Sequence, residues 1–383
     1  MLDIDILWMW YDYFYTLLCI DEEIKIIVFL LKQLPIMRFI SGIVVSLASP
    51  RGLSLWWNLG SLLGILIIAQ ILTGWLLTLY YINRLDLRFV SVWLLHLERW
   101  NGRVLHWVHI NVASFIFFFV YLHVLKGIHF QRWKTNKIVW RSGFVILVLL
   151  IGAAFLGYVL PFGQMRLWGA TVITNLLRVV RVSLVVWIWG GYRVNTLTLN
   201  LFFTLHYLLP FLILILVIRH LWLLHFGGST HFSLKGQFWP VYMWKDRLNL
   251  ILIMFILWWI LVYSYITADV ENFILANPSI RPLHIKPEWY FLTYYAILRS
   301  IPNKSLGVFL FALRLFMLMF IVLNSKFTLS FYYPSWRFWT SYFIILNFIL
   351  MLVGGSPVET PFLELGQVFS LSYFFWFVPL FWV

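Results

Sequence analysis

Two apolar stretches that begin and end with histidine decide the fold. Residues 109–123 read HINVASFIFFFVYLH, and residues 206–220 read HYLLPFLILILVIRH, so the terminal histidines are 14 residues apart in both. In a helix, 14 residues come within about 40° of four full turns and rise about 21 Å. Each helix would therefore carry two imidazoles on nearly one face, at two depths of a hydrocarbon layer about 30 Å thick.

Two further apolar stretches repeat this spacing with glycine. Gly60 and Gly74 lie 14 residues apart, and so do Gly143 and Gly157. Glycine lets another group approach the helix backbone closely. Two helices with ligands and two with gaps, all at one spacing, predict two haem b groups stacked across the membrane, each between two histidines. The predicted iron ligands are His109, His206, His123 and His220.

The same histidines have a simpler interpretation. A single histidine inside a membrane is often only hydrogen-bonded to a neighbouring helix. The shared spacing of four pairs argues against this, and polar groups in hydrocarbon are costly enough to indicate a function.

The composition indicates a membrane protein. Of the 383 residues, 63% are hydrophobic and 11% are charged, whereas soluble domains carry about 25% charged residues. The net charge of +14 does not indicate nucleic acid, because the basic residues lie between apolar runs, where they would attract anionic lipid. With Cys19 as the single cysteine, histidine would have to bind any metal.

Eight stretches are long and apolar enough to cross a membrane. We therefore predict an all-α, polytopic transmembrane helix bundle of eight spans, of which the first four house the two haems. Two predicted spans, the fourth and the fifth, separate the glycine-containing stretch 162–197 from the proline-rich stretch 268–303. These two irregular stretches should therefore lie on the same face of the membrane. The predicted spans are 55–80, 106–128, 142–161, 198–224, 248–267, 304–323, 337–354 and 363–382.

The spans divide the chain into three predicted parts. Residues 1–54 form an N-terminal interfacial segment, in which 24–34 and 36–48 could be amphipathic helices. Residues 55–225 form the haem-binding four-helix bundle, which includes the irregular stretch 162–197. Residues 226–383 hold the C-terminal transmembrane helices and the loop 268–303, and a loop of that length in a compact bundle is usually functional.

Local motifs along residues 55–383 resemble those of the cytochrome b family. The spacing of 14 residues in the fourth helix, and eight spans in one chain, favour the respiratory form over the chloroplast type. The resembling segments are WNLGSLLG at 57–64, GYVLP at 157–161, WGATVITN at 168–175, PEWY at 287–290 and AILRSIPNK at 296–304.

The resemblance implies the catalytic, quinone-binding subunit of complex III, the quinol–cytochrome c reductase. One haem would be held by His109 and His206, and the other by His123 and His220. Ubiquinol would be oxidised at one membrane face and ubiquinone reduced at the other, with coupling to proton translocation. The implied partners are a Rieske iron–sulfur protein, a cytochrome c1-type subunit, other complex III subunits, membrane lipid and a second copy in a homodimeric complex. The implied location is the mitochondrial inner membrane, with a bacterial plasma membrane as the alternative.

The resemblance also implies residues for the two quinone sites. Glu288 and Tyr295 are the predicted catalytic residues of quinol oxidation, since desolvation raises the proton affinity of a carboxylate. Loop capping by Glu288 and aromatic packing by Tyr295 remain open. The predicted quinol-oxidation site comprises Gly169, Pro287, Glu288, Trp289, Tyr290 and Tyr295. The predicted quinone-reduction site comprises His225, Ser229, Lys245 and Asp246, for which an ordinary juxtamembrane cluster is the alternative.

Several positions depart from the family pattern. His106, Lys126 and Leu201 stand where the family usually has arginine, and Phe162 stands where it has tryptophan. Those arginines are expected to pair with the haem propionates, so the propionate contacts of this chain stay open. Arg103, one turn before His106, could substitute.

Two other classes of membrane protein also carry histidines within their helices. A ferric reductase or the haem-b anchor of a dehydrogenase would also pair histidines, but neither would carry the PEWY loop. A haem-free transporter could use the histidines as a proton relay, but it would leave the glycine spacing unexplained.

Overall fold

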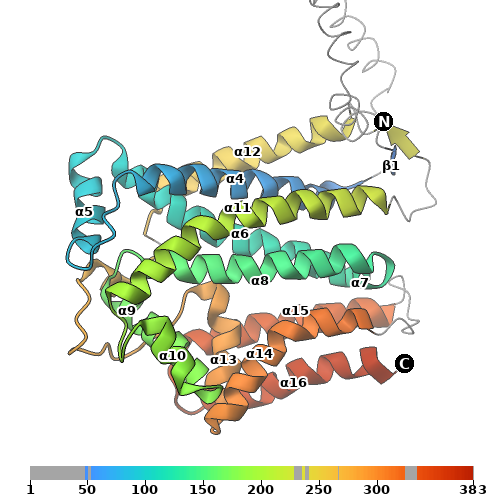
Figure 1. The fold of residues 1–383 in the computed structure, drawn as a ribbon. Coiled ribbons are helices and arrows are strands. Elements are labelled where there is room, and N and C mark those ends of the chain that lie inside the picture. Colours follow the sequence, from blue (N-terminus) through green and yellow to red (C-terminus); the bar gives the residue numbers. More distant parts are fainter. Residues whose placement is uncertain are drawn as a thin grey trace, which may run out of the picture. The chain divides into compact units, whose positions relative to one another are not determined.

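The described part of the chain is a bundle of long helices (Figure 1). The computed structural model describes residues 48–50, 53–227, 235–237, 241–265, 267–323 and 334–382. The predicted all-α transmembrane fold is confirmed, because seven helices in these ranges are long and apolar enough to cross a membrane. They are Leu55–Thr78, Gly102–His129, Lys137–Val159, Thr196–Phe226, Lys304–Leu323, Pro334–Gly355 and Phe362–Leu380.

The predicted fifth span, 248–267, corresponds to α12 (Val241–Val262), which ends five residues early. Asn111 of a neighbouring helix binds the residues that follow α12: it donates to the carbonyl of Ser264 at 3.1 Å and accepts from Thr267 at 2.8 Å. The apolar part of α12 after Arg247 is therefore shorter than the roughly 20 residues of a typical span. Ile256 and Ile260 of α12 are nonetheless buried in the core of the bundle.

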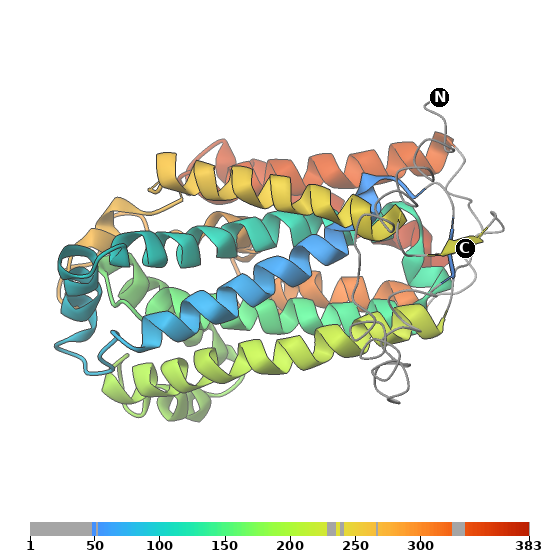
Figure 2. The ribbon, with the colours of Figure 1, turned by 90° about the horizontal axis from the view of Figure 1, so that it is seen from above.

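The helices with the repeated spacing pack in pairs. The glycine helix α4 (Leu59–Thr78) packs along the histidine helix α6 (Gly102–His129), and the glycine helix α8 (Lys137–Val159) packs along the histidine helix α11 (Thr196–Phe226). The two glycine helices thus lie against the two histidine helices (Figures 1 and 2).

Short helices gather at one end of this bundle (Figure 1). The long helix α11 begins there with a reciprocal cap, in which Asn195 accepts from the Leu197 amide at 2.7 Å and its own amide donates to Thr198 at 3.1 Å. Such a cap satisfies amide groups that the first turn leaves free. The short helices at this end are α5 (Arg88–Glu98), α9 (Gln164–Asn175), η2 (Leu176–Val179), α10 (Val182–Trp189) and η3 (Val270–Phe273).

The C-terminal helices form a second part of the core. α13 (Leu292–Ser300) packs against α14 (Lys304–Phe320), α15 (Pro334–Gly355) and α16 (Phe362–Trp382). Trp336 and Trp376 are fully buried there. The remaining short elements are η1 (Leu55–Asn58), α7 (Arg132–Thr135), η4 (Trp289–Phe291) and η5 (Ile321–Leu323).

The chain divides into two compact units, and the bundle is the larger. The smaller unit comprises residues up to 52 together with 231–245. In it, β1 (Ala48–Pro50) pairs antiparallel with β2 (Lys235–Gln237). The larger unit contains the haem-binding region predicted at 55–225 and most of the region predicted at 226–383. The amphipathic helices predicted at 24–34 and 36–48 lie outside the described residues, apart from Ala48.

Candidate functional site

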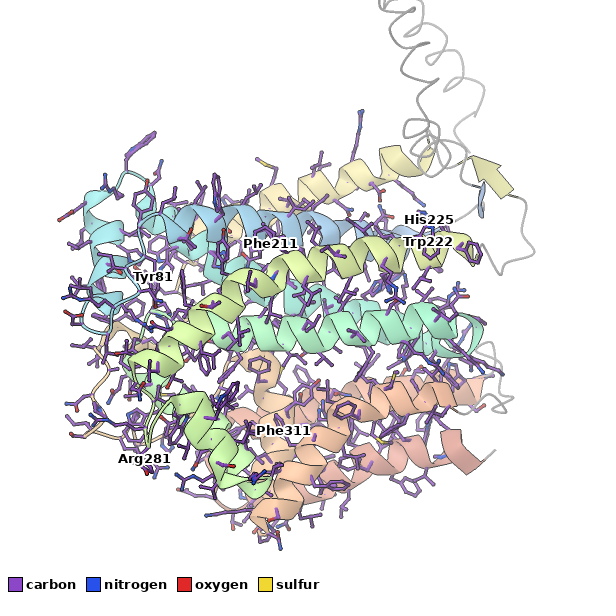
Figure 3. The ribbon with its side chains drawn as sticks, viewed as in Figure 1. Tyr81, Phe211, Trp222, His225, Arg281 and Phe311 are labelled. Atoms are coloured by element: carbon purple, nitrogen blue, oxygen red, sulfur yellow. The ribbon has the colours of Figure 1, made fainter. Side chains whose placement is uncertain are left out.

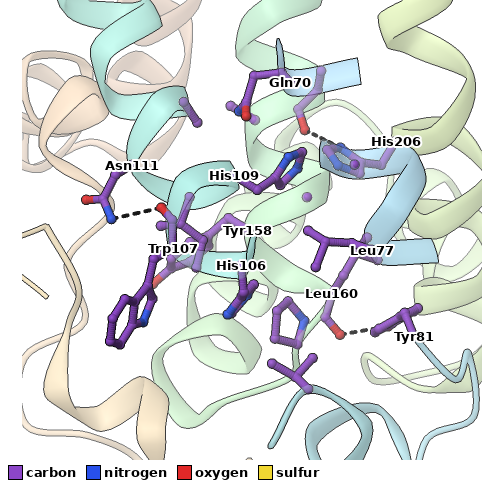
Figure 4. Close-up of a pocket in the computed structure, with 18 of the residues that line it drawn as sticks. Gln70, Leu77, Tyr81, His106, Trp107, His109, Asn111, Tyr158, Leu160 and His206 are labelled. Atoms are coloured by element: carbon purple, nitrogen blue, oxygen red, sulfur yellow. Dashed lines mark hydrogen bonds between the residues drawn. The ribbon is translucent and has the colours of Figure 1, made fainter. Parts of the chain in front are cut away.

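A cavity of about 280 Å³ opens between the helices that carry histidine and glycine. His109 of α6 and His206 of α11 project into it from different helices (Figure 4). Gly74 of α4 and Gly157 of α8 lie in the same lining. The structure therefore brings together one histidine from each histidine helix and one glycine from each glycine helix.

The two histidines face each other. Their ring centroids are 6.3 Å apart and their planes are nearly perpendicular, at 86°. Nδ1 of His206 lies 2.8 Å from the carbonyl oxygen of Ala153, to which it donates, and Nδ1 of His109 lies 2.8 Å from the hydroxyl of Thr73. A partner on Nδ1 orients the ring and leaves Nε2 for a metal.

The glycines of this layer lie against the imidazoles. A Cβ at Gly74 would be 3.0 Å from Cε1 of His109. A Cβ at Gly157 would overlap Cε1 of His206 and lie 2.8 Å from both ring nitrogens. Glycine thus leaves room for both rings, and the need for it is strongest at Gly157.

A second layer repeats this arrangement farther along the same helices. A Cβ at Gly143 would be 3.1 Å from Cε1 of His220, and one at Gly60 would be 3.8 Å from Cε1 of His123. Nδ1 of His220 is held by the hydroxyl of Ser142 at 2.7 Å. The buried Nδ1 of His123 has no hydrogen-bond partner among the described residues. All four predicted glycines therefore face the four predicted histidines, one to one.

The two irregular stretches meet at the end of the bundle next to the first layer, which confirms the prediction that they share a face. Gln164 connects them: its side chain donates to the carbonyl of Ile280 at 2.5 Å and accepts from the amide of Asn277 at 2.7 Å. Asn272 adds a bond to the hydroxyl of Tyr158 at 3.1 Å.

Glu288 lies at this junction. It lines the large cavity and also a small adjacent one of about 10 Å³, which Gly169 and Pro287 line as well. Burial raises the pKa of Glu288 to about 7, while the charge of Arg166 acts in the opposite direction. Three residues of the predicted quinol-oxidation site are thus brought together.

The other three predicted residues of this site do not line the small cavity. Tyr290 lines the large cavity and stacks on Phe117, with ring centroids 4.2 Å apart. The hydroxyl of Tyr295 donates to the carbonyl of Ile285 at 3.0 Å. Within the described residues, the linings of the two cavities include neither Tyr295 nor Trp289.

The predicted quinone-reduction residues are only partly described. His225 lies in the last turn of α11, at the end of the bundle opposite Tyr81 (Figure 3). Asp246 of α12 accepts a hydrogen bond from Ser61 at 2.8 Å. Ser229 lies outside the described residues. The grouping of these residues with Lys245 stays a prediction.

Two of the residues that stand in place of the family arginines, His106 and Lys126, make contacts of their own. His106 is buried, with Nδ1 2.7 Å from Nε2 of His96, and both rings line the large cavity. Arg103 is exposed and lies 5.7 Å over the Trp107 ring. Lys126 donates to the carbonyl of Trp56 at 3.3 Å. The one cavity-lining arginine among the described residues is Arg166, which no sequence motif singled out.

Comparison with known families agrees with this geometry. Residues 44–228 match the family model described as cytochrome b/b6/petB, and residues 275–374 match the one described as cytochrome b(C-terminal)/b6/petD. The chain belongs to the cytochrome b family. The family predicted from local motifs is thereby confirmed, and with its seven membrane-length helices in the described part the chain is a multi-pass membrane protein.

A solved structure is similar to this chain over most of its length. A chain of a hyperthermophilic respiratory complex III is 27% identical, with a TM-score of 0.86. The match covers 92% of this chain and 97% of that chain. The likeness therefore extends over both matched family regions.

Membership of the cytochrome b family implies b-type haem, and the residues present fit this group. Two metal–imidazole bonds of about 2 Å each account for most of the 6.3 Å between the centroids of His109 and His206, and the remainder is close to two ring radii. The lining is mostly apolar, as suits a porphyrin, and Gly74 and Gly157 leave room beside the rings.

Proposed function

We propose that this chain is the dihaem, quinone-binding catalytic subunit of a respiratory quinol–cytochrome c reductase. The main support for the proposal is that each of four glycines faces one of four histidines, in two layers. The two layers fit two haems, and a quinol site beside one of them fits a protein that passes electrons across the membrane.

The four histidines would hold the haem irons. His109 and His206 would hold one haem through Nε2, and His123 and His220 would hold the other. Thr73, Ala153 and Ser142 keep three of the four rings in place through Nδ1, as metal-ligating histidines generally require. When bound, the two haems supply one-electron carriers at two depths of the membrane.

Glu288 accepts a proton from quinol. Oxidation of a quinol to a quinone releases two protons and two electrons, so the site needs a base. A carboxyl group with a pKa of about 7 is suited to take up and release protons near neutral pH. Gly169 and Pro287 line the space beside it, and Tyr290 packs on Phe117 to fix the wall of the site.

Quinone is reduced at the opposite face. His225, Ser229, Lys245 and Asp246 supply protons there, and Asp246 is oriented by Ser61. The partners are a Rieske iron–sulfur protein and a cytochrome c1-type subunit within a homodimeric complex in lipid. The likeness to a chain of a respiratory complex III supports this setting. The membrane is the mitochondrial inner membrane or a bacterial plasma membrane.

Quinol titration of the purified complex tests this function. Anaerobic addition of ubiquinol is expected to reduce b-type haem, and addition of quinone is expected to reoxidise it. A transmembrane ferric reductase would respond to its own donor and not to quinol. Bound haem that does not respond to quinol or quinone would refute the proposed function while leaving the haem assignment intact.

A further inference from the structure

Arg166 lies beside the large cavity and forms no ion pair within the described residues. It lies on α9 and lines the cavity together with His109 and His206. Its Nε atom is buried and donates no hydrogen bond within the described residues. Its guanidinium group lies 5.6 Å from the ring centroid of Tyr158. Burying such a cation without a partner is costly, so the position indicates an anionic group in the cavity.

The described part of the protein supplies no such anion in an ion pair with Arg166. Glu288 lines the same cavity, but burial raises its pKa to about 7, which favours its uncharged form. A quinol is uncharged and would not need a cation either.

We propose that Arg166 binds a propionate of the haem held by His109 and His206. The inference rests on the proposed function. Haem b carries two carboxylates on one edge, and a guanidinium group can bind a carboxylate with two parallel hydrogen bonds. Arg103, the substitute suggested by the sequence, is exposed over Trp107 and does not line the cavity.

This contact would set the properties of one haem. A positive charge near the iron favours the reduced form, because the added electron lowers the net charge of the haem, and the effect is large where water is excluded. Arg166 would thus raise the reduction potential of the haem in the first layer. The second layer, with His123 and His220, lies farther along the helices and would be unaffected.

Redox titration of both haems in the assembled complex tests the proposal. In Arg166→Gln, the ratio of reduced to oxidised haem of the first layer, at a fixed potential, should fall roughly threefold to tenfold, where tenfold corresponds to about 59 mV. Arg166→Lys keeps the charge and should retain most of the wild-type ratio. Arg103→Gln is the matched control and should titrate like the wild type. Loss of the first-layer haem alone in Arg166→Gln, restored in Arg166→Lys, would also support the contact.

The contradicting results are equally specific. If Arg166→Gln holds both haems at their wild-type potentials, the propionate contact is wrong and the function still stands. If Arg166→Gln does not assemble, Arg166→Met is the uncharged variant to titrate. The same fall in the ratio of reduced to oxidised first-layer haem is expected in it. A wild-type complex without haem would instead refute the proposed function.

Discussion

Gly157 of α8 lies directly against the imidazole of His206 of α11. A Cβ at position 157 would overlap Cε1 of that ring and lie 2.8 Å from both of its nitrogens. The same relationship, less tight, joins Gly74 to His109 and Gly143 to His220, at 3.0 and 3.1 Å. Glycine at these positions therefore determines where the ligand rings can sit.

Replacement of Gly157 by alanine should displace His206 and lower the haem content of the first layer. Overpacking of this kind typically costs about 1–3 kcal/mol. Haem per polypeptide, measured on the purified complex, checks the outcome. Gly152→Ala is the matched control on the same helix, because a Cβ there meets nothing within 4 Å. Equal haem content in the two variants would contradict the steric argument.

Replacement of Thr73 by valine should leave the His109 ring less firmly held. Valine has nearly the shape of threonine, so the packing around the ring should be kept. The substitution removes the hydroxyl 2.8 Å from Nδ1, and loss of such a partner typically weakens metal binding or activity about 10- to 100-fold. The rate at which first-layer haem is lost to an external haem acceptor measures the effect. Thr204→Val, at an exposed position of α11 outside the cavity lining and with its hydroxyl on the Asn200 carbonyl, should lose haem at the wild-type rate.

Quinol oxidation should depend on the ionisation of Glu288. A base must be deprotonated to accept a proton, and the pKa of Glu288 is raised to about 7 by burial. The rate should therefore rise as pH increases through about 7. In Glu288→Gln it should fall roughly 100-fold or more, and the inflection near pH 7 should vanish.

A second carboxylate of the same loop provides the control for that profile. Glu271 lines neither cavity in the described structure, so Glu271→Gln should keep the wild-type rate and pH dependence. A profile in Glu288→Gln that still rises through pH 7 would show that another group is the base.

Replacement of Gly354 by alanine should separate α15 from α13. A Cβ at this position would overlap the carbonyl oxygen of Leu292, and a backbone atom cannot move aside as a side chain can. The expected cost is about 1–3 kcal/mol, visible as a lower thermal unfolding midpoint of the detergent-solubilised complex. A Cβ at the adjacent Gly355 would be 3.4 Å from a methyl group of Leu292, so Gly355→Ala should unfold near the wild-type midpoint.

The positions of the paired histidines could be predicted from the sequence because a helix has a fixed period. The spacing of His109 from His123, and of Gly60 from Gly74, already implied two layers. It did not say which glycine helix would face which histidine helix, since that depends on packing between α4 and α6 and between α8 and α11.

The end of α12 and the role of Arg166 could not be predicted from local pattern. Residues 263–267 continue an apolar run, but Asn111 of α6 binds Ser264 and Thr267 after the helix has ended. Arg166 lines the cavity, and its segment is joined to a distant loop. The joining bond runs from the Arg166 amide, which donates to the side chain of Asn272 at 3.1 Å. Both are contacts between segments more than 100 residues apart.

Haem per polypeptide, with a reduced-minus-oxidised spectrum, tests the four histidine ligands in the wild type, His206→Leu and His220→Leu. Two b-type haems are expected in the wild type and one in each variant, with the two variants retaining different haems. His284→Leu, at an exposed loop position, should keep both. A wild-type complex without haem, or variants that both keep two haems, would contradict the assignment of the four histidines as haem ligands.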